Sequence, residues 1–157
     1  MRMRKERKNP MKVFIKKLND LAVIPTRGSE EAAGSDLYAN LGAEGRVMAI
    51  LPGETVYVQT GLSMEIQDGC AGFIYARSGL AAERGLRPAN CVGVIDSDYR
   101  GEIIVALHND DEKLQTIRHG DRIAQIVFAP YLKPEYVVLS ELSATERGDG
   151  GFGHTGK

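Results

Sequence analysis

The chain has 157 residues, the length of a single domain, and its 43% hydrophobic and 26% charged content is typical of a folded protein. No apolar run approaches the roughly 20 residues that a membrane-spanning helix needs. The net charge of −1 combines +7 in residues 1–17 with −8 in residues 18–157, and an acidic body argues against a nucleic-acid-binding core. We therefore expect a soluble, cytoplasmic protein that binds no membrane and, through its core, no nucleic acid.

The basic residues 1–17 lead into a first predicted strand that contains Val13, Ile15 and Leu18. Charge runs at chain ends are usually solvated, so we expect an N-terminal extension, with contact to a polyanion as the alternative. Met11 begins the segment MKVFIKKL, and we expect the natural protein to start there.

Short apolar or alternating runs continue along the chain, and Gly, Asp, Asn or Pro separates most of them. We predict further strands at 47–51, 55–60, 62–66, 72–76, 92–95, 103–107, 122–128 and 136–139. One short helix is expected, with Ser78 as its N-cap, residues 79–84 as its turns and Gly85 as its end. The pattern predicts an all-β protein: an antiparallel sandwich, barrel or jelly roll.

The residues from Ser143 onward have no apolar period, and five of the last ten are glycine. Such a segment buries too little surface to hold itself in place, so we expect a flexible arm that orders on binding. Its sequence GFGHTGK matches GxxxxGK, but it lacks the strand and helix of a phosphate-binding loop. The expected organisation is an extension at 1–17, a β domain at 18–142 and a glycine-rich lid at 143–157.

Several polar residues stand where they suit an anionic substrate. Arg77, Ser78 and Gly79 place a cation beside free amides at a predicted helix start, although an ordinary capped helix has the same pattern. On the arm, Arg147 offers a guanidinium for phosphate and Phe152 a ring for stacking on a base.

Two further positions suit catalysis or binding. Asp96 directly follows an apolar strand and so suits a general base better than Asp98 in the next turn, although both residues are also turn formers. Gln125 is the lone amide of an apolar strand and must bond either a ligand or backbone.

Five ordered motifs together resemble those of the trimeric dUTP diphosphatases, the dUTPases. They are AGSDLYA, ARSGLA, NCVGVIDSDYRG, GDRIAQIVF and RGDGGFGHTG. The resemblance implies a β jelly roll, a homotrimer with sites shared between subunits, and Mg²⁺-dependent hydrolysis of dUTP to dUMP and pyrophosphate. That reaction limits uracil incorporation into DNA and supplies dUMP for thymidylate synthesis.

The resemblance also implies roles for the motif residues around the nucleoside. Asp96 is the expected general base for the water that attacks the α-phosphorus. Tyr99 is expected to lie against the deoxyribose and to exclude a 2′-hydroxyl. The uracil edge is read by Asn90 and by the backbone of Gly93, Val94, Ile95 and Asp96.

The phosphate chain is expected to bind a set of residues from two motifs: Arg77, Ser78, Gly79 and Gln125. On the arm, Arg147 acts catalytically by clamping the phosphates, and Phe152 with Gly153 closes over the uracil. Magnesium is expected mainly on the triphosphate, with Asp36 touching it through water at most. Two positions depart from the common family pattern without removing a functional group: Ala76, where proline is common, and His154, where serine is also common.

Two rival functions share this fold. A dCTP deaminase needs a glutamate on the strand after the motif hairpin, and the corresponding position is Ala106. A non-catalytic nucleotide-binding regulator is expected to lack the base or the arm arginine, whereas Asp96 and Arg147 are both present. The sequence therefore favours a dUTPase.

Overall fold

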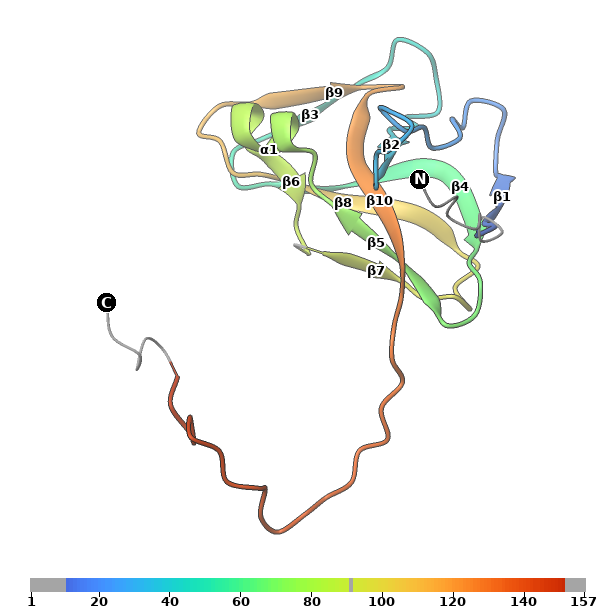
Figure 1. Cartoon of the computed structure of the whole chain (residues 1–157). Coiled ribbons are helices and arrows are strands. Elements are labelled where there is room, and N and C mark those ends of the chain that lie inside the picture. The colour runs from blue at the N-terminus through green and yellow to red at the C-terminus, as the bar shows by residue number, and fades with distance from the viewer. Residues whose placement is uncertain (1–10, 91, 152–157) are drawn as a thin grey trace, which may run out of the picture.

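The computed structural model describes residues 11–90 and 92–151 and contains two four-stranded antiparallel sheets (Figure 1). The first sheet has the order β1-β4-β8-β6, the second has the order β2-β10-β5-β7, and β3 pairs with β9. The strands are β1 Phe14–Lys17, β2 Ser35–Tyr38, β3 Val47–Ile50, β4 Thr55–Glu65, β5 Cys70–Tyr75, β6 Leu86–Pro88, β7 Gly93–Ile95, β8 Glu102–Asn109, β9 Gln115–Arg118 and β10 Arg122–Pro130. This architecture confirms the predicted all-β jelly roll.

Alternate strand residues face the core, as the two-residue period of a strand requires. On β8, Ile103, Val105 and Leu107 are buried, whereas Ile104 between them is exposed. The second sheet contributes residues such as Ile126 of β10 to the same core cluster. The apolar core thus fixes which side chains of each strand remain outside to form a site.

Strand β4 joins two segments that the sequence predicts as separate strands, 55–60 and 62–66. The chain passes between them through Gly61, whose φ is 69°. The pairing register with β8 shifts between Gln59 and Ser63, which marks a β-bulge. A Cβ at Gly61 would lie 2.8 Å from the Cβ of Ala22, so only glycine fits this bend.

The one helix, α1, spans Ser78–Arg84. Gly85 ends it with a left-handed φ of 61°, as predicted. The predicted N-cap is wrong, because the capping position is Arg77 in extended conformation, without a side-chain capping bond, and Ser78 lies in the first turn. No helix within the described ranges is long and apolar enough to cross a membrane.

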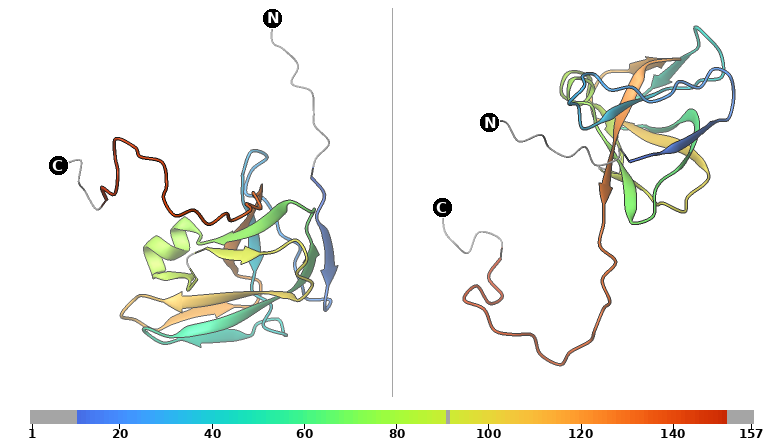
Figure 2. Two further views of the ribbon diagram at one scale, coloured as in Figure 1. Left: turned by 90° about the horizontal axis from the view of Figure 1, so that it is seen from below. Right: turned by 45° about the vertical axis from the view of Figure 1, so that its right-hand side comes forward.

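Residues 131–151 leave the sheets after β10 and form an extended arm (Figures 1 and 2). The predicted strand at 136–139 is wrong for the single chain, because no ladder forms there. The arm nevertheless carries large apolar side chains that contact little of their own chain: Tyr136 is 89% and Val138 96% exposed. An apolar segment of this kind lacks the packing surface that a strand needs.

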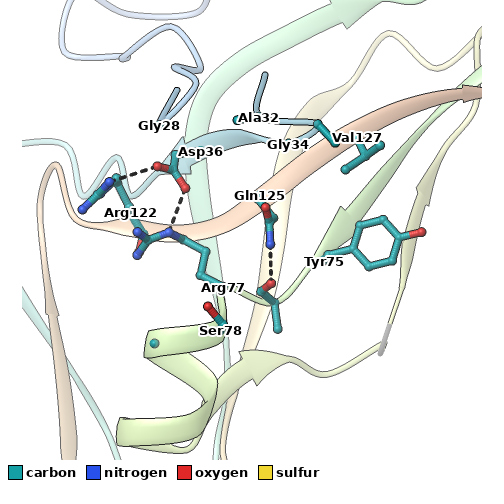
Figure 3. A pocket seen from close by; sticks show the side chains of 13 residues that line it. Gly28, Ala32, Gly34, Asp36, Tyr75, Arg77, Ser78, Arg122, Gln125 and Val127 are labelled. Atoms are coloured by element: carbon teal, nitrogen blue, oxygen red, sulfur yellow. Dashed lines mark hydrogen bonds and ion pairs between the residues drawn. The ribbon is translucent and has the colours of Figure 1, made fainter. Parts of the chain in front are cut away.

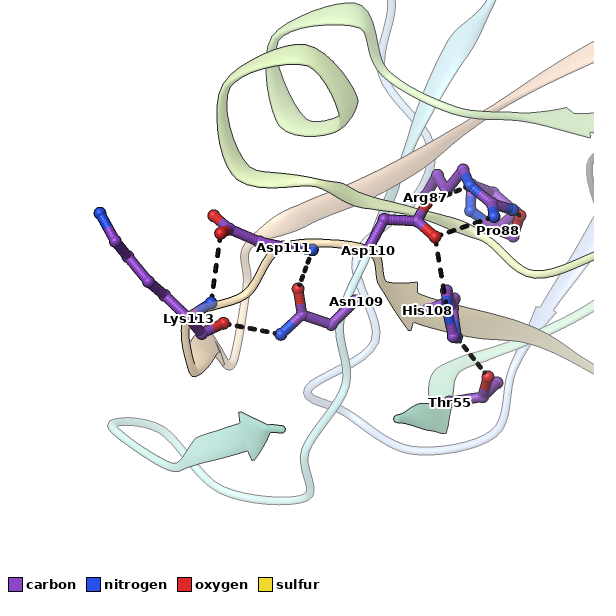
Figure 4. Close-up of polar contacts among 8 residues, drawn as sticks. All are labelled: Thr55, Arg87, Pro88, His108, Asn109, Asp110, Asp111 and Lys113. Atoms are coloured by element: carbon purple, nitrogen blue, oxygen red, sulfur yellow. Dashed lines mark hydrogen bonds and ion pairs between the residues drawn. The ribbon is translucent and has the colours of Figure 1, made fainter. Parts of the chain in front are cut away.

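A polar network ties the ends of β4, β6 and β8 together (Figure 4). Asp110 accepts hydrogen bonds from Arg87 on both carboxylate oxygens, and Nη2 of Arg87 lies 3.1 Å from Oδ1. His108 is 3.4 Å from the same carboxylate through Nε2 and 2.8 Å from the Thr55 hydroxyl through Nδ1. Because these four side chains bind one another, we interpret the network as structural.

Candidate active site

A cavity of about 570 Å³ lies where α1 begins beside β2, β5 and β10 (Figure 3). Four of its lining residues are phosphate-binding candidates from the sequence: Arg77, Ser78, Gly79 and Gln125. The other lining residues are Gly28, Ala32, Ala33, Gly34, Asp36, Tyr75, Ala76, Arg122 and Val127. The fold therefore brings together three separate sequence motifs.

Asp36 holds two arginines at the wall of this cavity (Figure 3). Its Oδ1 accepts a hydrogen bond from Nε of Arg77 at 2.7 Å, and its Oδ2 accepts one from Nη1 of Arg122 at 3.1 Å. The Asp36 side chain is only 14% exposed, so water competes weakly for its oxygens. The pair of ion pairs fixes both guanidinium groups before any ligand arrives.

Arg77 retains donors for a ligand while it is held in this way. Its Nη1 donates to the carbonyl of Arg122 at 3.2 Å, and its Nη2 has no hydrogen-bond partner within the described ranges. A guanidinium with a free edge matches the oxygen geometry of phosphate. Ser78 and Gly79 are exposed beside it, at the first turn of α1.

Gln125 is held by backbone, as one of the two sequence interpretations expects. Its Nε2 donates to the carbonyl of Ala76 at 2.9 Å. Its Oε1 lies against Gly34, where an added Cβ would come within 2.5 Å of that oxygen. A side chain at position 34 would therefore displace the amide, which explains the glycine in the AGSDLYA motif.

The Asp96 segment forms a second, smaller cavity of about 160 Å³. Its lining residues are Val94, Ile95, Asp96, Tyr99, Glu102 and Ile104. The hairpin expected in the NCVGVIDSDYRG motif does not form, because β7 pairs with β5 and β8 pairs with β4 and β6, so the two strands lie in different sheets. A β-turn, here called the Asp96 turn, joins them, and in it the amide of Tyr99 donates to the carbonyl of Asp96 at 3.2 Å. Asn90 lies shortly before β7, and its Nδ2 would be 3.1 Å from a Cβ at Gly93.

The two cavities lie at different levels along β5, and no residue lines both. Ile95, beside Asp96, pairs with Gly72 near the start of β5, whereas Tyr75 at its end lines the larger cavity. Three strand residues separate these levels, which is about 10 Å. The Asp96 turn and the arginine cavity of one chain therefore lie apart and share no lining residue.

The remaining predicted residues lie on the arm. Arg147 is exposed, and its Nε donates to the carbonyl of Gly150 at 2.8 Å. Phe152 and Gly153 lie outside the described residues. Arg122 also lines the larger cavity, and the sequence did not identify it as a site residue. The available signal was its place in the motif GDRIAQIVF, directly before the apolar run, which puts it on the strand that carries Gln125.

The described residues contain no cluster of three or more His, Cys, Asp or Glu side chains that could hold a metal ion. Asp36 is the single carboxylate on the larger cavity, and both of its oxygens accept from arginine. This donor set fits Mg²⁺ carried by phosphate oxygens and water rather than enclosed by protein.

Comparisons with known proteins agree on one family. The chain matches the family model described as dUTPase over residues 20–156. It is 48% identical over 147 residues to the deoxyuridine 5′-triphosphate nucleotidohydrolase of Nautilia profundicola, covering 94% of this chain and 100% of that one. The same named enzyme of Desulfotalea psychrophila is 48% identical over 133 residues, covering 85% and 87%.

A solved structure shares the fold. A point mutant of the dUTPase of Staphylococcus bacteriophage 80alpha, with dUpNHpp, has a TM-score of 0.80 and 26% sequence identity to this chain. The similarity covers 93% of this chain and 99% of the phage chain.

Proposed function

Because the chain belongs to the dUTPase family, we propose that it hydrolyses dUTP to dUMP and pyrophosphate. This reaction limits uracil incorporation into DNA and supplies dUMP for thymidylate synthesis. The observation that carries the proposal is the larger cavity, where Arg77 and Arg122 are fixed by Asp36 beside Gln125. Two held guanidiniums are suited to the charge of a triphosphate.

In the proposed mechanism, Asp96 removes a proton from the water that attacks the α-phosphorus. The attack forms a bond from water oxygen to the α-phosphorus and breaks the bond to the bridging oxygen, which leaves with pyrophosphate. Phosphoryl substitution depends on in-line positioning and charge neutralisation more than on covalent help. Arg77, Ser78, Gly79 and Gln125 would hold the leaving phosphates during this step.

Strand β7 and the Asp96 turn are proposed to recognise the nucleoside. Asn90 and the backbone of Gly93, Val94 and Ile95 would bind the uracil edge, and the Tyr99 ring would cover the deoxyribose. The arm would complete the site: Arg147 clamps the phosphates, and Phe152 and Gly153 close over the base. A lid of this kind excludes water from the site, which strengthens the electrostatic interactions between the arginines and the phosphates.

Magnesium is proposed as the cofactor, bound by the phosphates of dUTP. When bound, it neutralises phosphate charge and orients the chain of phosphates. Asp36 is the one cavity carboxylate that could approach it through water, and its ion pairs with arginine support a positioning role in addition.

We propose that three copies of the chain assemble and share their sites. The separation of the Asp96 turn from the arginine cavity supports this, because the turn of one copy could complete the arginine cavity of another. The arm supports it too, since its exposed apolar residues have no contact surface on their own chain. If the arm reaches a neighbouring subunit, it would bring Arg147 and Phe152 to the site of that subunit.

The reaction is tested by measuring pyrophosphate release with Mg²⁺ from dUTP, dTTP, dCTP and UTP. We expect release from dUTP in large excess over the other three nucleotides. Ammonia or dUMP formed from dCTP would support the deaminase alternative instead, and binding of dUTP without pyrophosphate release would support a non-catalytic regulator.

The geometry does not favour the deaminase. Ala106 lies opposite Tyr57 on β4 and supplies no carboxylate. The other carboxylate on the smaller cavity, that of Glu102, accepts a hydrogen bond from the amide of Gly61 at 2.7 Å. Among the described residues of that cavity, Asp96 is thus the carboxylic acid whose side chain has no hydrogen-bond partner from the protein.

Site sharing is tested by complementation between two impaired chains. One chain carries Asp96→Asn, and the other ends at Ala144 and lacks the arm. If subunits share sites, co-refolded mixtures contain sites with an intact Asp96 and an intact arm, and activity returns. If each chain builds its own site, every site lacks one part and the mixture stays inactive, which would contradict the shared arrangement.

Asp36→Asn is expected to raise KM for dUTP about 10-fold, because one arginine loses a charge-assisted hydrogen bond. Steady-state kinetics over a range of Mg²⁺ concentrations, from limiting to saturating, measures the change. Asp68→Asn, in an exposed turn, is the matched control and is expected to keep the parent KM. A KM that returns to the parent value at high Mg²⁺ would argue for metal contact and against the positioning role.

A further inference from the structure

The Tyr99 ring folds back over the backbone of Gly101. A Cβ at residue 101 would lie 2.5 Å from Cζ of that ring and would also meet its hydroxyl oxygen. The hydroxyl donates to the carbonyl of Glu102 at 3.0 Å. The observed ring position therefore requires a residue without a side chain at 101.

Residues 100–103, which lie beneath this ring, are hydrogen-bonded to the bulge of β4. The carboxylate of Glu102 accepts from the Gly61 amide at 2.7 Å. The Thr60 hydroxyl donates to the carbonyl of Ile103 at 2.6 Å, and the Ser63 hydroxyl donates to that of Arg100 at 2.7 Å. Two of these bonds hold the backbone carbonyls of Arg100 and Ile103, and the third holds the Glu102 side chain, so a clash at position 101 is relieved by movement of the ring more than of the backbone.

We propose that Gly101 is a specificity-determining residue, which sets the dUTP-over-UTP preference by allowing the Tyr99 ring to lie close to the backbone of residues 101 and 102. The inference rests on the proposed function, in which that ring covers the deoxyribose. A ring displaced by a methyl group at 101 no longer occupies the space beside the sugar, and a 2′-hydroxyl gains room. Gly101 acts through Tyr99 and is thus a positioning residue.

Alanine at position 101 is compatible with folding. Gly101 is not among the glycines with positive φ, so an L-residue adopts its backbone conformation. The atoms in the way belong to the outer end of a side chain that is 42% exposed. The ring is free to swing outward, so the change affects the site more than the stability.

The test compares kcat/KM for dUTP and UTP in four variants of the full chain: Gly101→Ala, Tyr99→Ala, the double variant and Tyr99→Phe. Gly101→Ala is expected to lower the dUTP/UTP ratio about 10-fold, within the roughly 100-fold that sterics alone achieve against an added hydroxyl. Tyr99→Ala is expected to lower it at least as much. Tyr99→Phe keeps the ring and is expected to keep most of the preference.

The double variant shows whether residue 101 acts through the Tyr99 ring. If residue 101 acts only through the ring, Gly101→Ala has no further effect once Tyr99 is alanine, so the two changes are non-additive. Thermal unfolding of Gly101→Ala, within a few degrees of the parent, is the expected sign of an intact fold.

The outcomes separate the inference from the function on which it rests. Loss of preference in Tyr99→Ala with full preference in Gly101→Ala would overturn the inference and leave the proposed function standing. Full preference in both would remove Tyr99 from sugar recognition and the inference with it. Additive effects in the double variant would show that residue 101 acts by another route and would also overturn it.

Discussion

Asp96→Asn is expected to bind dUTP with Mg²⁺ about as tightly as the parent and to hydrolyse it about 100- to 10,000-fold more slowly. The amide has the size of the carboxylate and keeps its place after β7, but it cannot accept the proton of the attacking water. Single-turnover kinetics and equilibrium binding, measured on the same preparation, separate the two quantities. Near-normal turnover in this variant would remove Asp96 from the role of base.

Asp98→Asn is the matched control for this experiment. Asp98 lies in the same turn and is exposed like Asp96, but it does not line the smaller cavity beside that turn. We expect its turnover to stay close to that of the parent. A loss equal to that of Asp96→Asn would mean that the charge of the whole turn, and not one base, supports the reaction.

A chain that ends at Ala144 is expected to stay folded and trimeric while its turnover falls about 1,000-fold, in the range known for a transition-state arginine. The fold survives because the last strand, β10, ends at Pro130, well before the cut. The activity falls because Arg147 and the residues after it are missing. Size-exclusion chromatography with light scattering and pyrophosphate release measure the two effects.

Arg147→Lys separates charge from geometry in the same segment. Lysine keeps the charge but loses the planar fork that binds two phosphate oxygens, so we expect a loss smaller than that of truncation. Full activity in the chain that ends at Ala144 would contradict the assignment of residues 143–157 as a lid.

Local patterns in the sequence predicted the elements that local chemistry determines. The alternating and apolar runs located most of the strands, and Gly85 ended the helix because it adopts a left-handed φ of 61°. The fold places Arg77 and Gln125 in one cavity, and both belong to motifs to which the family resemblance assigns phosphate binding. The strands β2, β6 and β9 were missed because each contains a single Leu or Ile and therefore shows no apolar or alternating run.

Contacts between residues that lie far apart in the sequence could not be predicted from local patterns. Asp36 binds Arg77 and Arg122 at separations of 41 and 86 residues, and no spacing rule predicts such pairs. The strand predicted at 136–139 has the right composition, but its partner is absent from the single chain. Ser78 has the chemistry of a cap, whereas the extended backbone of Arg77 takes that position.

Hydrolysis of dUTP in water enriched in ¹⁸O reports both the products and the phosphorus that water attacks. The full chain with Mg²⁺ is incubated with dUTP, and the products are analysed by mass spectrometry. We expect dUMP that carries one ¹⁸O atom from the solvent and pyrophosphate that carries none. Label in pyrophosphate, or the formation of dUDP and phosphate, would contradict the proposed reaction.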